Sequence, residues 1–198
     1  MKKKITLVVA LALVLVVGVF GTLAYLTDST SAVKNTFTVG KVDIDLDESD
    51  NLDFQLIPGN TLKKDPKVTV VAGSEACYLF VKVEASNNLN TFIQYAIDST
   101  WTKGDGTNVP TDVWYRTVDA TTAKTGVTYN VLASSTAYPD GYVTVKGTVT
   151  STDMATLYKE DGTVDQDKLP TLTFTAYACQ SANVASVKDA WDAVKPTT

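Results

Sequence analysis

Alternation of apolar and polar residues dominates the chain from about residue 40 onward. In the segment KVDIDLDE, residues 41–48, every second residue is apolar up to Leu46, and Asp43, Asp45 and Asp47 occupy the positions between. A period of two is typical of a strand with one face on a core and the other in solvent. We therefore predict a half-buried strand here, with a solvated acidic face.

The segment ACYLFVKVEAS, residues 76–86, carries the strongest strand pattern. Odd-numbered residues from Cys77 to Ala85 are expected to face the core, and even-numbered residues from Tyr78 to Glu84 to face away from it. The last clear strand is TLTFTAYACQ, residues 171–180. Further short strands are predicted in KVTVVAG at 67–73, VWYRTVDA at 113–120, VTYNVLAS at 127–134 and YVTVKGTVTS at 142–151.

Turn and cap signals separate these strands. The loop TTAKTG, residues 121–126, lies between two strand-like runs and predicts a hairpin. Residues 152–162 suggest a short helical turn capped by Thr152. The segment SVKDAWDAVK, residues 186–195, is the one regular helix, with Ser186 as its cap and an apolar stripe that includes Trp191. Eight to ten short strands predict an all-β, jelly-roll-like antiparallel β-sandwich with this C-terminal helix and minor helical insertions.

The N-terminus has a different pattern. Three lysines follow Met1, and an apolar run with no charged residue comes next. Its dense part, residues 5–20, is shorter than the roughly 20 residues that a spanning helix needs, and a small-x-small triplet ends at Ala24. We predict a signal peptide, residues 1–24, cleaved between Ala24 and Tyr25, with a retained anchor as the alternative. The membrane would then be contacted only through the precursor N-terminus.

Composition removes several function classes. The chain has 17 basic and 22 acidic residues, and its net charge of −5 argues against nucleic acid as a partner. It has no histidine, which excludes Ser-His-Asp and Cys-His nucleophile pairs, the HExxH zinc helix and His₃ metal sites. We expect no catalytic residues and no cofactor.

The acidic run that begins at Asp43 is a weak candidate for metal binding. It fails the EF-hand template, because Glu48 stands where that loop needs glycine and Phe54 where it needs glutamate. Strand alternation explains Asp43, Asp45 and Asp47 without a metal. Five aromatic residues could form a sugar-binding face, but aromatics at alternate strand positions favour core or cross-strand packing: Trp101, Trp114, Tyr115, Tyr129 and Tyr142.

Cys77 and Cys179 are the only cysteines, and in an exported chain they would form the one possible disulfide. Strand parity raises a difficulty. Cys77 shares its face with inward residues, whereas Cys179 lies on the opposite face from Phe174 and Ala178. Pairing therefore needs a bulge near Cys179 or an earlier strand end, and we leave both states open.

Four motifs occur in order along the chain. They are AYLTDSTSAVKNTFTVGKVDIDL at 24–46, PGNTLKKDPKVTV at 58–70, CYLFVKVE at 77–84 and LTFTAYACQ at 172–180, followed by the helix with Trp191. The first contains the pattern NTF-x-x-G-x-x-D-I. Together they resemble the TasA/camelysin (CalY) family of secreted biofilm-matrix fibre proteins, whose signal peptides are processed by a SipW-type signal peptidase. Residues 87–163 carry no motif that can be aligned.

The resemblance implies a sandwich exported to the matrix or cell surface of a Gram-positive-type bacterium. It also implies fibres, in which the N-terminal segment of one subunit adds as a strand to the next. Residues 25–40 would be this extended donor segment, and residues 41–198 a single sandwich domain. The predicted assembly-strand residues are Tyr25, Leu26, Thr27, Val33, Thr36 and Phe37.

The partners implied are other copies of the chain, with other matrix proteins as further candidates, and the SipW-type peptidase during export. A non-polymerising surface or adhesion protein is the main alternative. Some family members are described as a metallopeptidase, but the residues of this chain give that activity no support, because it has neither histidine nor an HExxH motif.

Overall fold

The computed structural model describes residues 40–49 and 55–196. All of them belong to the second of the two units into which the chain divides, Val39–Thr198. The predicted boundaries at residues 24 and 40 stay predictions. Within the described part, no helix combines the length and the apolar character needed to cross a membrane.

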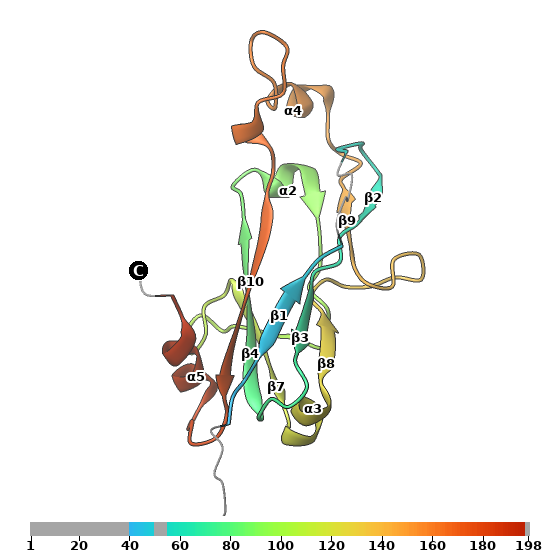
Figure 1. Cartoon of the computed structure of the whole chain (residues 1–198). Helices are drawn as coiled ribbons and strands as arrows, with labels where there is room; N and C mark the ends of the chain where they lie inside the picture. Colours follow the sequence, from blue (N-terminus) through green and yellow to red (C-terminus); the bar gives the residue numbers. More distant parts are fainter. Residues whose placement is uncertain (1–39, 50–54, 197–198) are drawn as a thin grey trace, which may run out of the picture. The chain divides into compact units, whose positions relative to one another are not determined.

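Antiparallel strands in three sheets make up most of the regular secondary structure of the described chain (Figure 1). The β1 sheet contains β1 (Ile44–Asp47), β3 (Lys67–Val70) and β8 (Val127–Asn130), in that order. The β4 sheet has the order β10 (Leu172–Gln180), β4 (Cys77–Ala85), β7 (Val113–Val118) and β6 (Thr102–Lys103). The β9 sheet places β9 (Tyr142–Val145) between β2 (Thr61–Lys63) and β5 (Ile93–Gln94). The all-β, sandwich-like class predicted from the sequence is confirmed.

Short helices connect or cover these sheets. They are α2 (Leu89–Phe92), α3 (Ala120–Thr125), α4 (Ser151–Ala155), the 3₁₀ turn η1 (Gln166–Lys168) and α5 (Val187–Val194). Two cap predictions differ in outcome. Ser186 caps α5 by accepting from the backbone N–H of Asp189, as expected. The cap of α4 is Thr150 rather than Thr152, because Asp153 completes a capping box with Thr150.

Strand β4 lies at the centre of the structure. All nine of its residues pair with β10, from Cys77 opposite Gln180 to Ala85 opposite Leu172, and residues 77–82 pair with β7 on the other side. Its inward side chains pack with Val68 and Val70 of β3 in a core between the β4 and β1 sheets. This agrees with the inward face predicted from its alternation.

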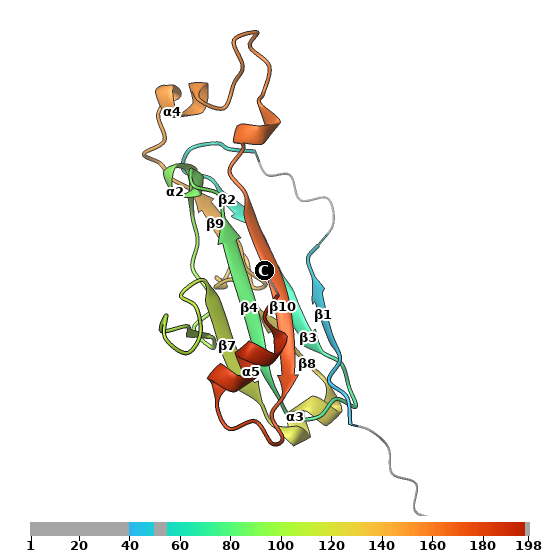
Figure 2. The same ribbon diagram turned by 90° about the vertical axis from the view of Figure 1, so that its left-hand side faces the viewer.

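The other face of β4 carries Phe80, as its alternation predicts, and this face is also covered. Phe80 is fully buried, and its ring centroid lies 5.3 Å from that of Trp191 on α5. Figure 2 shows α5 lying across β10 and β4, on the side away from β1, β3 and β8. Trp191 also meets Tyr177 of β10 edge-on, with centroids 5.5 Å apart. The apolar stripe of α5 therefore covers a further core, on the face of the β4 sheet opposite β1, β3 and β8.

The loop at residues 121–126 does not form a hairpin, so that prediction is wrong. Strand β7 pairs with β4, whereas β8 pairs with β3 in the other sheet. The loop folds as α3, capped by Asp119, which accepts from the backbone N–H of Thr122 at 3.0 Å. Gly126 ends α3 with φ of +82°, a conformation that glycine adopts at little cost. Helix α3 therefore connects a strand of the β4 sheet to a strand of the β1 sheet.

The two cysteines are free thiols in the structure, so the disulfide that the sequence left open is not formed. Cys179 pairs across the ladder with Tyr78, and Cys77 pairs with Gln180. Because directly paired residues share a face, Cys179 lies on the α5 side and Cys77 on the inner side. No bulge interrupts this register, so the two sulfur atoms stay on opposite faces of the sheet and cannot form a disulfide. Burial, with a smaller contribution from Cys179, raises the pKa of Cys77 to about 11.

A buried carboxylate fixes the chain just after β1. Asp65 is 2% exposed, and its two oxygens accept from the backbone N–H of Ser49 at 3.2 Å and from its hydroxyl at 2.7 Å. Lys63 Nζ lies 3.0 Å from Oδ2. Burial by itself raises the pKa of Asp65, but the bonds from Ser49 and Lys63 outweigh burial and hold it below its ordinary value.

We expect Trp191→Ala to destabilise the fold by about 3–5 kcal/mol, because the substitution uncovers Phe80 and leaves a cavity under α5. Urea unfolding followed by tyrosine fluorescence measures this. The control is Lys188→Ala on the same helix, whose exposed pair with Asp192 is worth about 0.5 kcal/mol or less. Equal losses in both variants would contradict a structural role for this cover.

We expect Asp65→Asn to cost about 1–3 kcal/mol at pH 7, since an amide cannot replace the charged acceptor. The folded pKa lies below the unfolded value, so the carboxylate stabilises the fold above about pH 4 and loses this effect as the pH falls through the folded pKa. The difference from wild type should therefore shrink as the pH falls through the folded pKa. Unfolding free energies between pH 2 and 8 test this, with Asp140→Asn, which removes a partly exposed pair with Lys67, as control. A difference that does not depend on pH would contradict it.

Candidate functional site

Strand β10 is the longest strand at an open sheet edge in the described part of the chain. It pairs with β4 over all nine residues, and no strand within residues 40–49 or 55–196 pairs with its other side. In an antiparallel ladder, backbone N–H and C=O groups alternate between the two sides of a strand. Every second residue of β10 therefore directs its backbone polar groups away from β4, and such an edge can accept another strand.

Strand β1 lies beside this edge without completing it. It belongs to the other sheet, where β3 is its one partner among the described strands, from Ile44 opposite Val70 to Asp47 opposite Lys67. The predicted inward face of β1 is only partly inward. Ile44 packs on the central core, but the Leu46 side chain is 39% exposed, because no third layer covers it among the described residues.

Two adjoining hollows form a groove along the start of β10, which we call the edge groove. The smaller one, of about 300 Å³, lies between the end of β1 and β10, and Leu46, Pro66 and Phe174 contribute to its walls. The larger one, of about 410 Å³, continues toward the β9 sheet. Leu172 and Thr173 line both, so the hollows follow the same stretch of the β10 edge.

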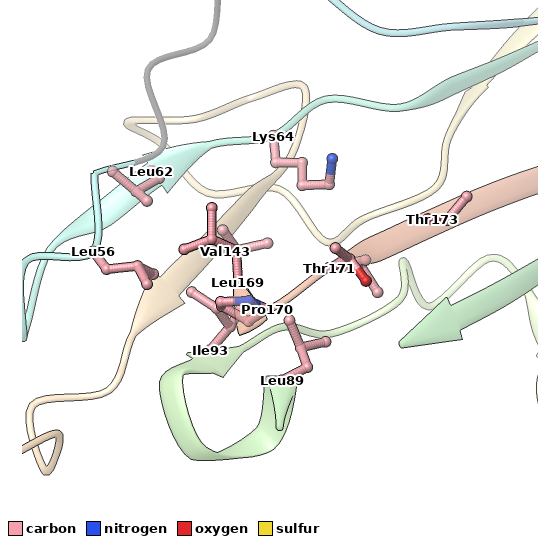
Figure 3. Close-up of a pocket in the computed structure, with 11 residues that line it drawn as sticks. Leu56, Leu62, Lys64, Leu89, Ile93, Val143, Leu169, Pro170, Thr171 and Thr173 are labelled. Atoms are coloured by element: carbon pink, nitrogen blue, oxygen red, sulfur yellow. The ribbon is translucent and has the colours of Figure 1, made fainter. Parts of the chain in front are cut away.

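The lining of the larger hollow is mostly aliphatic. Figure 3 shows apolar side chains from separate segments facing the same space. They come from the segment before β2, from β2, β9, α2 and β5, and from the segment that leads into β10: Leu56, Leu62, Val143, Leu89, Ile93, Leu169 and Pro170. The set suits apolar side chains of an incoming segment better than a polar reactant.

One ion pair lies at the rim of the groove. Lys64 Nζ is 2.9 Å from Glu48 Oε1 and 5.6 Å from the centroid of the Phe174 ring. The bonds between Asp65 and Ser49 hold the adjacent chain in place. These contacts join the end of β1 to the segment before β3, so they fix the width of the groove at its polar end.

The described residues offer no metal centre. Within them, no three His, Cys, Asp or Glu side chains lie close enough together to hold an ion. The weak candidates Asp43, Asp45 and Asp47 occupy every second position at β1, where same-face neighbours are about 7 Å apart. Asp43 also pairs with Lys41 at 3.1 Å. This donor set does not fit a catalytic zinc ion.

The aromatic residues of the possible sugar-binding face do not form one surface, and the favoured packing interpretation is confirmed for Trp101, Tyr115, Tyr129 and Tyr142. Trp101 is buried, donates to the backbone oxygen of Asn130 at 2.8 Å, and meets Tyr129 edge-on. Tyr115 packs near Phe80 on the opposite face of the β4 sheet. Tyr142 lies against Tyr138, and Trp114 packs at the margin of the central core.

The sequence-predicted assembly residues lie outside the described part of the chain. This applies to the cleavage pair Ala24 and Tyr25 and to the rest of the proposed strand: Leu26, Thr27, Val33, Thr36 and Phe37. The edge groove was not predicted. The alternation of β10 placed Leu172 and Phe174 inward, but it carried no information on which strands would be missing beside them.

Comparison with known protein families gives a match over the N-terminal part of the chain. The family model described as camelysin metallo-endopeptidase matches residues 1–91. This range includes β1 to β4 and three of the four motifs that carried the resemblance. No curated protein matches the chain.

The label of that family names a metallopeptidase, whereas the described residues contain no group fitted to a metal, and the chain has no histidine. The resemblance predicted from the motifs is confirmed: over residues 1–91 the chain is similar to the camelysin family, the family that includes TasA.

Proposed function

We propose that this chain is a secreted structural subunit of extracellular fibres, in a biofilm matrix or on the cell surface, and that copies join by strand addition. The observation that carries the proposal is the open edge of β10 beside the apolar edge groove. Residues 25–37 of a second copy are the proposed occupant. Cleavage after Ala24 by a SipW-type peptidase would release that segment from the membrane.

Backbone pairing and side-chain burial would act together at this edge. An added strand satisfies the outward N–H and C=O groups of β10, whatever its sequence. Its alternate side chains would face the groove, where Leu46, Leu172 and Phe174 offer apolar contacts. In residues 25–37, Tyr25, Val33 and Phe37 are separated by even numbers of positions. In a strand they would therefore lie on one face and could supply such contacts together.

The geometry of this contact favours polymers over closed dimers. The donor is an N-terminal segment and the acceptor is a groove, so the two surfaces of one copy differ. A contact between unlike surfaces leaves a free donor at one end and a free acceptor at the other. Repetition of the contact then extends a filament, with other copies of the chain as its main partners.

Filament formation by the processed chain, residues 25–198, tests the proposal by electron microscopy and light scattering. We expect filaments from this form and monomers after deletion of residues 25–34. Leu46→Lys should raise the critical concentration about tenfold or more, because burying one leucine contributes about 1.5–3 kcal/mol.

Val164→Lys is the matched control, since Val164 has nearly the same exposure as Leu46 but lines neither hollow of the edge groove. Equal polymerisation by the truncated form would contradict strand addition. A folded chain that stays monomeric in all forms would instead favour the surface or adhesion protein.

The family label motivates a separate test of peptidase activity. We expect the purified chain to leave casein uncleaved, with or without added zinc, because the described residues provide no metal ligands in a group. Gel analysis with and without a chelator measures this. Chelator-sensitive cleavage that persists through purification would contradict the structural assignment and favour the peptidase.

A further inference from the structure

A second cavity, separate from the edge groove, has a mixed lining. It is an open surface hollow of about 530 Å³ beside β5, β6, β7 and the end of β9, and we call it the lysine cavity. Tyr95, Trp114, Ile93 and Ile97 provide its apolar surface. Its polar side chains are Asn90, Gln94, Lys103 and Lys146. A volume of this size accommodates a small ligand of a few rings.

The two lysines of this cavity differ from most others in the described chain. Eight described lysines form ion pairs with carboxylates, namely residues 41, 63, 64, 67, 82, 168, 188 and 195. Within residues 40–49 and 55–196, the lysines outside any ion pair are Lys103, Lys124, Lys146 and Lys159. Two of these four line one cavity, which contains no lining carboxylate. In an acidic protein this is a local concentration of uncompensated positive charge.

Neutral groups hold both ammonium groups in position. Lys103 Nζ lies 5.5 Å from the centroid of the Trp114 ring, a cation–π contact, and its neighbour in the ladder is Trp114 itself. Lys146 donates to the backbone oxygen of Asn90. Neither contact neutralises the charge, and each ammonium has three donors, so both retain donors for an anion.

Two amides complete the polar lining. The side chains of Asn90 and Gln94 are exposed, and within the described residues neither makes a hydrogen bond to protein. An amide offers both donors and an acceptor, which suits hydroxyl groups. Tyr95 and Trp114 add aromatic surface of the kind that packs on the apolar face of a sugar ring.

From these features we infer that the lysine cavity binds an anionic saccharide, one with carboxylates on its sugar rings. The lysines would pair with the carboxylates, the amides would bond the hydroxyls, and the aromatic and isoleucine side chains would contact the ring faces. This site does not depend on strand addition. Of its lining residues, Ile93 alone also lines the edge groove, and neither lysine does.

Calorimetric titration of the purified protein with trigalacturonate tests the inference. We expect saturable binding that weakens with salt, and a loss of affinity of at least tenfold in the double variant Lys103→Gln, Lys146→Gln. The matched control is Lys124→Gln, Lys159→Gln, which removes the same charge from lysines outside the cavity, and its affinity should stay within twofold. Unfolding curves of both double variants confirm that the fold is retained.

Three outcomes would overturn the inference. Maltotriose, a neutral trisaccharide, binding as tightly as trigalacturonate would remove the role of charge. Inorganic phosphate binding as tightly would indicate a simple anion site without saccharide recognition. Absence of saturable binding to trigalacturonate, or an equal loss in the two double variants, would show that the cavity does not bind this class. Filament formation is scored separately, so its failure does not affect this result.

Discussion

The burial of β4 on both faces is the constraint on which the rest of the structure depends. Its inner residues require the β1 sheet as a cover, and Phe80 on its other face requires α5. Because β4 also pairs on both sides with β10 and β7, the surrounding elements are fixed by this one strand. A strand enclosed in this way cannot shift register by one residue without exposing one core and burying polar groups in the other.

The position of β10 follows from that arrangement. It satisfies one side of β4 with all nine residues, and the chain then turns into α5 rather than into another strand. The next strand in space, β1, belongs to the other sheet. Between the end of β1 and the start of β10, Leu46 and Leu172 line a hollow instead of packing in a core. An edge with both unpaired backbone and apolar surface is the combination that strand addition requires, and it supports the proposed fibre subunit.

Charge placement separates the two surfaces proposed to be functional. At the edge groove, Lys64 pairs with Glu48 and Asp65 binds Ser49, so charges there stabilise the wall and leave the floor apolar. At the lysine cavity, Lys103 contacts the Trp114 ring and Lys146 the Asn90 backbone oxygen, and no described carboxylate forms an ion pair with either lysine. The first arrangement suits burial of another protein segment, and the second suits a polar anion.

The sequence by itself determined the local elements: the alternation of β4 and β10, the cap and apolar stripe of α5, the parity that keeps Cys77 and Cys179 apart, and the family motifs up to residue 91. These are set by interactions between residues a few positions apart. Only the tertiary structure decided that Phe80 is buried, that the loop before β8 is a crossover, and that β10 has an open edge. Each of these depends on which element packs from elsewhere in the chain, and no local period encodes that. For the same reason Lys103 and Lys146, 43 positions apart, show their shared cavity only in the folded chain.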